Sequence, residues 1–243
     1  MIQISEHIFA TMHDDANDQP YVYLIHGSSW NLQIDTGNSP RNYHLFLQEI
    51  EQAGFAKPKL IGLTHWHWDH TFGMMEAEVP VMASAKTDAY LRKICRWQWT
   101  EEAMRERLRT GEEISFCDEK MHVEYADVTS IRVRHADIIL PADTVFDLGD
   151  VTVRAIQADS PHTRDAMFWL VEEDETLIAG DGEYEDYYDN GGHYDPKRLS
   201  AYIRFLENLS FKRYARSHDE AWTTKENILK KLEQAMHQCE RDK

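Results

Sequence analysis

The hydrophobic positions of this chain fall into short β-type runs and longer runs with helical spacing. Near the start, apolar and β-branched residues gather at 8–10, 21–25 and 30–34. Turn-forming residues at 26–29 separate the last two runs, so we expect an antiparallel hairpin there. Further β-type runs lie at 59–64, 79–83, 144–146, 151–156, 167–171 and 176–179.

Helix caps combined with a period near 3.6 residues predict three amphipathic helices. The first begins at Pro40, after the cap residue Ser39, and the second begins at Pro196. The third is expected to begin near Thr223, because Glu226 three residues later completes a capping-box pattern. Strands followed by a helix, repeated in the second half of the chain, favour an α/β fold with two similar halves.

The middle of the chain is harder to interpret. Residues 87–110 have helical spacing, but Trp97 and Trp99 interrupt it. These two rings either bend over a functional site or pack into the core, and the sequence does not separate the two possibilities. We expect one domain spanning 1–243, with a partly helical insertion at about 85–140.

Composition and charge limit the classes of partner. Of the 243 residues 42% are hydrophobic and 28% charged, and no apolar run approaches the roughly 20 residues of a membrane span. The formal net charge of −17 repels polyanions, which argues against nucleic acid or an anionic membrane as a partner. We therefore expect a small-molecule substrate. The sequence leaves the oligomeric state open, a homodimer included.

The N-terminus and the cysteines favour a cytoplasmic protein. The first residues lack the basic region and apolar core of a secretory signal. Cys95, Cys117 and Cys239 are odd in number and form no CxxC motif, which fits reduced thiols better than a disulfide framework.

The densest group of candidate ligands is the segment 65–70, which contains three histidines and an aspartate. Neutral imidazole and carboxylate are the ligands that zinc, iron and manganese accept. The alternating spacing points His65 and His67 the same way, while Asp69 and His70 point elsewhere. One segment can therefore serve two neighbouring metal ions.

Three later residues occupy similar positions along the chain. The run 59–64 before the histidine cluster is expected to be a buried strand, so the cluster lies on the turn that leaves a sheet. His162, Asp181 and His218 also follow β-type runs and also lie among turn-forming residues. Each alone is more often a surface histidine or a turn aspartate, but together with the cluster they recur at the exits of strands.

The order HxHxDH, then His, then Asp, then His resembles the metallo-β-lactamase superfamily. Asp35-Thr36-Gly37 after the hairpin is similar to another recurring feature of that family, and the resemblance spans Tyr21 to His218. It implies an αββα sandwich, two mixed sheets flanked by helices, with the metals in a groove at one edge of the sheets.

The resemblance also implies a set of ligands. His65, His67 and His162 would bind the first metal, Asp69, His70 and His218 the second, and Asp181 would bridge them. Two divalent ions are expected, zinc first, with manganese and ferrous iron as alternatives. The family's GHTxG around the third ligand is here Pro161-His162-Thr163-Arg164-Asp165, without the glycines.

Two ions that share a carboxylate would trap a water and lower its pKa toward neutrality. We therefore expect a metal-dependent hydrolase that uses a metal-bridging hydroxide on a small lactone, ester or thioester. Asp69 and Tyr184 are the expected catalytic residues. Tyr184 follows Asp181 by three residues and could donate a hydrogen bond to a substrate oxygen, although ordinary packing explains it equally well. This D-x-x-Y arrangement resembles the acyl-homoserine lactonase branch, and the motifs are also similar to those of glyoxalase II-like members.

Three alternatives stay open. A mononuclear iron oxidoreductase of the persulfide dioxygenase kind shares HxHxDH, a phosphodiesterase could share the whole fold, and a non-catalytic binding module would not need seven ligands. The segment 183–194 is rich in acidic and tyrosine residues. If it borders the groove, it would favour neutral or cationic substrates over polyanions.

Overall fold

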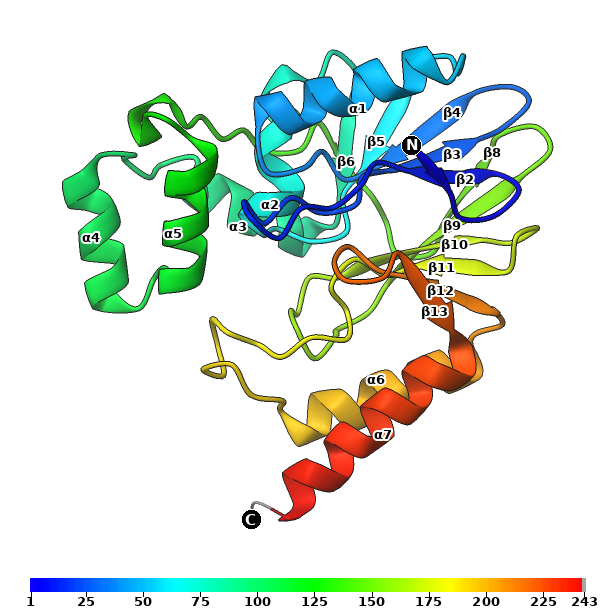
Figure 1. Ribbon diagram of the computed structural model, residues 1–243. Coiled ribbons are helices and arrows are strands. Elements are labelled where there is room, and N and C mark those ends of the chain that lie inside the picture. Colours follow the sequence, from blue (N-terminus) through cyan, green and yellow to red (C-terminus); the bar gives the residue numbers. More distant parts are fainter. Residues whose placement is uncertain (242–243) are drawn as a thin grey trace.

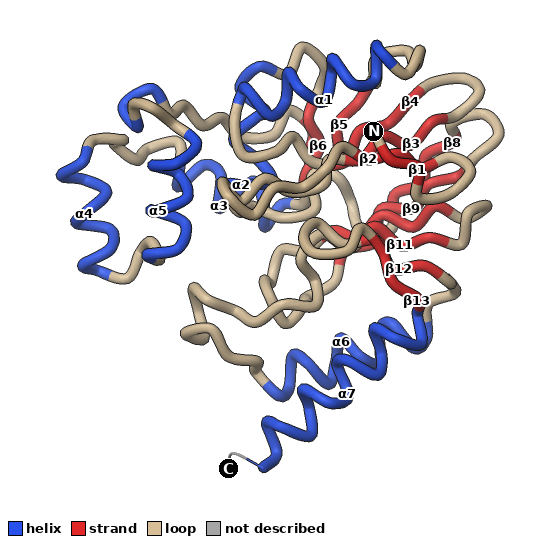
Figure 2. Tube along the Cα trace, in the orientation of Figure 1, coloured by secondary structure: helices blue, strands red, loops and turns tan. Residues whose placement is uncertain are grey.

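Two β-sheets pack face to face, and helices cover their outer sides (Figures 1 and 2). The structure, a computed structural model, describes residues 1–241. The first half of the chain builds a seven-stranded sheet in the order β1-β2-β3-β4-β5-β6-β7, and the second half builds a six-stranded sheet in the order β13-β12-β11-β10-β9-β8. The expected αββα sandwich of two mixed sheets is confirmed.

The strands of the first sheet are β1 (Ile2–Gln3), β2 (Ile8–Ala10), β3 (Tyr23–His26), β4 (Asn31–Ile34), β5 (Leu60–Gly62), β6 (Val81–Ala83) and β7 (Ile138–Ile139). Those of the second are β8 (Thr144–Asp147), β9 (Thr152–Gln157), β10 (Met167–Val171), β11 (Thr176–Ile178), β12 (Arg213–Ala215) and β13 (Trp222–Thr224). Neighbours from β1 to β4 are antiparallel and those from β4 to β7 are parallel. In the second sheet only β11 and β12 are parallel neighbours. Strand β12 is the β-type run expected before His218, whereas β1, β7 and β13 were not expected.

Helix α1 (Pro40–Gln52) covers the first sheet, while α6 (Pro196–Asn208) and α7 (Lys225–Arg241) cover the second (Figure 1). The expected caps are present at the first two helices, since Ser39 accepts a hydrogen bond from the Asn42 N–H and Asp195 caps α6. The third helix starts later than expected. Thr223 pairs with Tyr214 in the sheet, and α7 begins at Lys225.

The remaining helices follow β5 and precede β7 in the chain. They are α2 (Trp68–Thr71), the 3₁₀ helix η1 (Phe72–Glu76), α3 (Ala85–Ile94), α4 (Glu101–Thr110), α5 (Ser115–Glu124) and the 3₁₀ helix η2 (Val128–Ser130). Helices α4 and α5 project to one side of the sandwich (Figure 1). Trp97 and Trp99 lie between α3 and α4, and the Arg107 guanidinium stacks on both rings at 4.5 and 4.8 Å from their centroids. They therefore pack in the core of this helical region.

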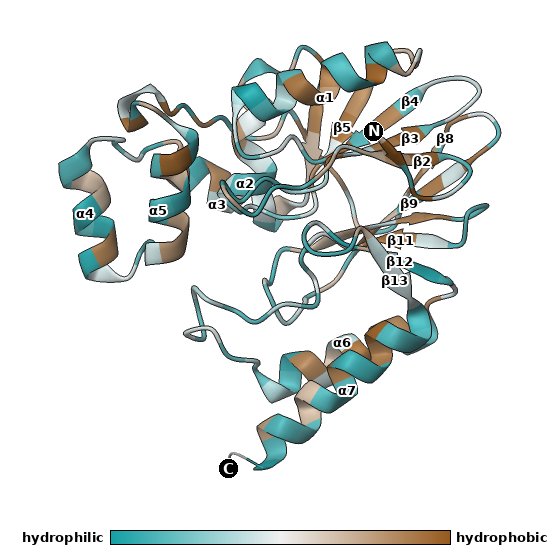
Figure 3. Ribbon diagram, in the orientation of Figure 1, coloured by the Kyte–Doolittle hydropathy of each residue, from teal (hydrophilic) through white to brown (hydrophobic). Residues whose placement is uncertain are grey.

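Strand β10 shows how the main core is divided. Alternate side chains of a strand point to opposite faces, so Trp169 packs between the sheets and Phe168 packs against α6 and α7. Both are fully buried, which explains the unbroken apolar sequence of this strand. Figure 3 shows hydrophobic residues along strands of both sheets and within α1 and α6. Within residues 1–241, no helix has the length and apolar character needed to cross a bilayer.

A polar contact joins the two sheets near the N-terminus. Asp174, in the turn between β10 and β11, accepts a hydrogen bond from the His7 backbone N–H at 2.9 Å, and its other oxygen is 2.7 Å from His7 Nδ1. Ser5 Oγ also donates to Asp174. Burial alone would lower the pKa of His7, but the carboxylates of Asp174 and Asp150 raise it above its usual 6.5.

This contact predicts a pH-dependent stability. The protonated His7 is favoured in the folded state, so its contribution is complete below pH 6.5 and is lost as pH rises through the raised pKa. His7→Gln should lower the free energy of unfolding by about 1 kcal/mol at pH 6, and by clearly less at pH 9. Thermal unfolding of both proteins with a chelator present would measure this, and an equal loss at both pH values would contradict it.

Candidate metal centre

The predicted ligands come together because the strands that precede them end at one edge of the sandwich. Strands β11 and β12 are parallel, and β9 runs in the same direction because β10 is antiparallel to both of its neighbours. Their ends therefore bring the following turns to the same edge, where parallel strands commonly present functional groups. The turns carry His162, Asp181 and His218, and the turn after β5 carries the cluster at 65–70.

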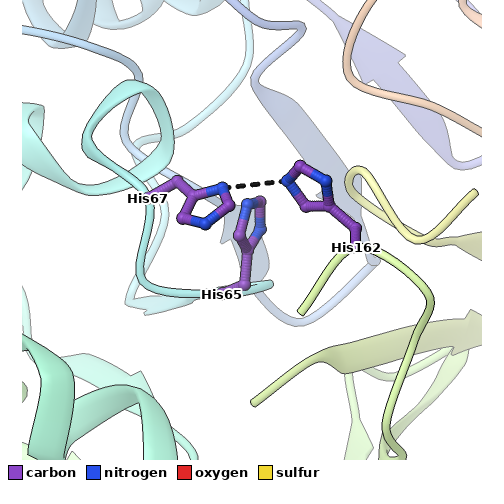
Figure 4. Close-up of side chains that lie close together, drawn as sticks. All are labelled: His65, His67 and His162. Atoms are coloured by element: carbon purple, nitrogen blue, oxygen red, sulfur yellow. Dashed lines mark hydrogen bonds between the residues drawn. The ribbon is translucent and has the colours of Figure 1, made fainter. Parts of the chain in front are cut away.

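The seven side chains form two adjacent groups, each with ligand atoms within 4.8 Å of one another. One group is His65, His67 and His162, and the other is Asp69, His70, Asp181 and His218. Figure 4 shows the first group, in which His67 Nδ1 and His162 Nε2 face each other at 2.9 Å. All seven residues predicted as metal ligands are thus brought together, and the cluster at 65–70 contributes to both groups.

Asp181 lies between the two groups. Its Oδ2 is 3.4 Å from His70 Nε2 and 3.7 Å from Nε2 of both His162 and His218. The preceding Gly180 has φ +58°, and a Cβ on it would come within 2.8 Å of Thr64. The close approach of this turn to the β5 exit therefore requires glycine.

Asp35 orients His70, a member of the second group, through its Nδ1 atom. It follows β4 directly, and its carboxylate accepts hydrogen bonds from the Thr64 N–H at 2.7 Å, the Thr64 hydroxyl at 2.8 Å and His70 Nδ1 at 2.8 Å. A proton held on Nδ1 leaves the lone pair of His70 on Nε2, directed at the other ligands. The sequence had singled out Asp35 only through the Asp-Thr-Gly motif, and its contact with His70 is what the structure adds.

His162 is fixed without the glycines that the family motif has. Its Nδ1 donates to the Glu185 carbonyl at 2.8 Å, so Nε2 is free to act as a ligand. The loop closes through polar contacts: the Ser160 N–H donates to the Thr163 carbonyl at 2.9 Å, and the Thr163 N–H donates to Ser160 Oγ at 3.0 Å. Thr163 also donates to the buried Asp165, and burial raises the pKa of Asp165 to about 6.

The electrostatics suit a bound cation. Burial, reinforced by the neighbouring histidines, lowers the pKa of His65 and His67 well below 6.5, so both are neutral. Burial alone would raise the pKa of Asp69 and of Asp181, but the adjacent His70 and His218 hold both well below the usual range. Conversely, the carboxylates of Asp181 and Asp69 outweigh burial and raise the pKa of His218 to about 9. The ionised carboxylates of the cluster therefore favour the binding of a positive charge.

Unpartnered atoms point to the same conclusion. His65 Nε2 and Asp181 Oδ1 are buried and have no hydrogen-bond partner among the described residues. A buried polar atom without a partner costs roughly 1–3 kcal/mol, and a metal ion would use both atoms. Neutral imidazoles plus ionised carboxylates are also the donor set that divalent zinc, iron and manganese accept. The residues fit the expected metals.

A cavity of about 330 Å³ opens above this cluster. Its lining residues are Asp15, Asp18, His67, Asp69, Ile114, Phe116, Cys117, His162, Asp181, Tyr184, Tyr187, Tyr188, His218 and Asp219. The segment 183–194 thus borders the cavity through three tyrosines, whereas Trp97 and Trp99 do not line it. The Tyr184 hydroxyl donates to Asp219 Oδ2 at 2.8 Å, so it could reach a substrate oxygen only after that bond breaks.

Sequence reasoning missed one wall of the cavity, the loop that carries Asp18. Asp18 has a left-handed backbone, φ +56°, in a turn closed by two backbone hydrogen bonds between Asp14 and Gln19. Burial and the nearby Asp69 raise the pKa of Asp18 to about 7. A non-glycine residue at positive φ is a possible sign of function, but nothing in the local sequence indicates that the loop faces His218.

That loop is held by Glu124 at the end of α5. Its carboxylate accepts hydrogen bonds from Asn17 Nδ2 at 2.6 Å and from the Ser39 hydroxyl, and it forms a salt bridge with Arg41. A single buried carboxylate therefore connects the Asp18 loop, the start of α1 and the end of α5.

The opposite wall is held by an ion pair between Asp186 and Arg198. Arg198 Nη1 is 2.5 Å from Asp186 Oδ2, and both side chains are buried. Arg198 also donates to the Ser160 carbonyl from Nε at 3.0 Å and from Nη2 at 2.6 Å. The pair thus connects the tyrosine-bearing loop, the His162 loop and α6.

This pair predicts a large loss of stability on neutralisation. Asp186→Asn leaves the Arg198 guanidinium buried without a counter-charge, which should cost about 3 kcal/mol in the free energy of unfolding. Asp189→Asn is the matched control, because its contact with Arg164 is exposed and 3.6 Å long, and it should cost less than about 0.5 kcal/mol. Urea unfolding of the metal-free proteins would measure both losses, and similar small losses would contradict the structural role of Asp186.

Comparisons with known proteins agree with this geometry. The fold is similar to a metallo-beta-lactamase from Pontibacter korlensis, with 17% identity, TM-score 0.65, and 96% of this chain and 97% of that chain covered. GOB-18 from Elizabethkingia meningoseptica gives 17% identity, TM-score 0.63 and coverage of 100% and 92%. The archaeal superfamily protein ST1585 from Sulfolobus tokodaii gives 18% identity and a TM-score of 0.59, with 94% of this chain and 86% of that chain covered. At these identities the likeness shows the fold alone.

No curated protein matches this chain significantly. The sequence pattern of the metallo-beta-lactamase superfamily, however, matches residues 16–218, which is most of the chain. The protein therefore belongs to the metallo-beta-lactamase superfamily.

Proposed function

We propose that this protein is a dinuclear metal-dependent hydrolase of small esters, lactones or thioesters. The observation that carries the proposal is the pair of adjacent ligand groups at the base of a cavity, with Asp181 within 3.7 Å of both. His65, His67 and His162 would hold one ion and Asp69, His70 and His218 the other. Zinc is the first expectation, and the donor set also suits manganese and ferrous iron.

When bound, two such ions supply Lewis acidity for the substrate carbonyl and lower the pKa of a water toward neutrality. The chain's own residues do the rest. Asp35 and the Glu185 carbonyl accept hydrogen bonds from Nδ1 of His70 and of His162, which aims Nε2 of each ring at the cluster. In the overall reaction a water oxygen bonds to the acyl carbon, the bond from that carbon to the leaving oxygen or sulfur breaks, and the leaving group takes a proton.

Two alternatives are less well supported. An iron oxidoreductase would need only the first group and one carboxylate, whereas here His70 and His218 also converge on Asp69 and Asp181, at 2.9 and 3.7 Å. A phosphodiesterase would bring an anionic substrate to a cavity lined by Asp15, Asp18 and Asp219, where like charges disfavour binding. Location in the cytoplasm stays an expectation.

Elemental analysis followed by a substrate panel tests the proposal. We expect about two divalent ions per chain, and turnover of neutral lactones, esters or thioesters once that metal is restored. One iron per chain together with oxygen consumption on thiol persulfides would overturn it in favour of the oxidoreductase.

The Asp181→Asn variant tests the shared ligand. Replacing one carboxylate oxygen by a neutral amide weakens both groups, so metal occupancy should fall and turnover should be abolished. Asp159→Asn is a suitable control, because Asp159 lies in the same His162 loop but is exposed and paired with Lys86. Unchanged metal stoichiometry in Asp181→Asn would count against the bridging role.

The Asp35→Asn variant tests whether the hydrogen bond between Asp35 and His70 Nδ1 supports metal binding. Asparagine tolerates the left-handed backbone of Asp35, φ +60°, so the fold should be kept. Without the carboxylate the proton on His70 Nδ1 is less firmly held, and zinc affinity should fall roughly 10–100-fold. Competition with a chromophoric chelator would measure it, and an affinity within twofold of the wild type would refute the contact's role.

A further inference from the structure

The cavity above the metal ligands has a charge pattern that the ligands themselves do not explain. At its base lie His67, Asp69, His162, Asp181 and His218, and three further carboxylates line it: Asp15, Asp18 and Asp219. No lysine or arginine is among the lining residues. The cavity is therefore lined by carboxylates beyond the expected ligands and by no lysine or arginine.

The neighbouring lysines contact a backbone carbonyl or a ring of the lining residues and form no salt bridge with a lining carboxylate among residues 1–241. Lys120 donates from Nζ to the backbone carbonyls of Asp15 and Ala16, and Lys231 lies 5.1 Å from the centroid of the Tyr184 ring. Within residues 1–241, neither Asp18 nor Asp219 forms a salt bridge. Asp15 has only a contact at 3.4 Å with His13, and its own side chain is 83% exposed.

Asp18 and Asp219 are held in position. Both have left-handed backbones, with φ +56° and φ +59°. The Tyr184 hydroxyl donates to one oxygen of Asp219, which leaves the other oxygen available to a ligand. The Asp18 loop is fixed through Asn17 and Glu124. These carboxylates are therefore preorganised, unlike those of a freely solvated acidic loop.

The remaining lining is aromatic and apolar. Phe116 and Tyr187 are each 51% exposed at the mouth, while Tyr184 and Tyr188 lie deeper. Aromatic faces attract cations through their quadrupole, and they suit alkylated ammonium groups because these also bury apolar surface. Carboxylates and aromatic rings around one cavity are thus complementary to a cation with a hydrocarbon surface.

We propose that the substrate of this cavity is a cationic ester or lactone that carries a substituted ammonium group. The inference rests on the proposed hydrolase function. The carbonyl group faces the metal ligands, and the ammonium group lies among Asp18, Asp219 and the tyrosines. This arrangement places the cation close to carboxylates other than the expected ligands, and it disfavours substrates with a free carboxylate.

A matched pair of esters tests the selectivity. Acetylcholine and its uncharged isostere 3,3-dimethylbutyl acetate have the same shape and the same acyl group. We expect kcat/KM to be at least about tenfold higher for acetylcholine. Each of Asp18→Asn and Asp219→Asn should reduce this ratio several-fold, since asparagine keeps the left-handed backbone and removes the charge. A ratio near one, or preference for the uncharged ester, would overturn the proposal.

Two further measurements separate this inference from its premise. Glu119→Gln, an exposed residue on α5 outside the cavity lining, removes the same charge and should leave the ratio as it is; an equal effect would mean that only the net charge of −17 matters and would refute a specific site. Calorimetric binding of benzyltrimethylammonium to metal-loaded and metal-free protein needs no turnover. If neither ester is hydrolysed, hydrolysis of esters fails as a function, and the binding result alone decides: loss of binding in Asp18→Asn and Asp219→Asn supports the cation site, and absence of binding in the wild type refutes it.

Discussion

The buried carboxylate of Asp35 is the contact on which the site depends most. A buried charge is tolerated only when it is fully paired. Asp35 meets this condition through three hydrogen bonds, two from Thr64 and one from His70. These bonds join the end of β4 to the end of β5 and fix the ring of one ligand at the same time. The hydrogen bond between His70 Nδ1 and Asp35 therefore fixes how the His70 ring is placed and which of its nitrogens carries the proton.

Buried charged groups also hold the walls of the cavity, farther from the expected metal ligands. Glu124 binds the Asp18 loop through Asn17, and the Asp186–Arg198 pair holds the loop with the tyrosines. In both cases one buried charged group satisfies several polar groups from segments far apart in sequence. Loops that would otherwise be mobile are thereby held rigid against the sandwich, and rigid walls lower the entropic cost of binding a small molecule.

Two sets of carboxylates line the cavity, the expected ligands and Asp15, Asp18 and Asp219. At the base, carboxylates and imidazoles form a site that attracts divalent cations, as the lowered pKa of Asp69 and the raised pKa of His218 indicate. The additional lining carboxylates Asp18 and Asp219 form no salt bridge with a lysine or arginine among residues 1–241. Under the proposed function, substrate selectivity would come from residues that take no part in holding the metals. This separation is expected where function is determined by sites on a common fold.

Much of the fold and the ligand set followed from the sequence. The cap at Ser39, the alternating apolar strands and the HxHxDH spacing are local patterns, and local geometry determines where such side chains point. The sequence could not determine that Thr223 belongs to a strand, because its partner Tyr214 is on another segment. Nor could it show that Asp18 faces His218, that Tyr184 bonds to Asp219, or that Arg198 fixes the His162 loop. Those contacts join residues distant along the chain, and only the packing of the two sheets and their helices decides which distant residues meet.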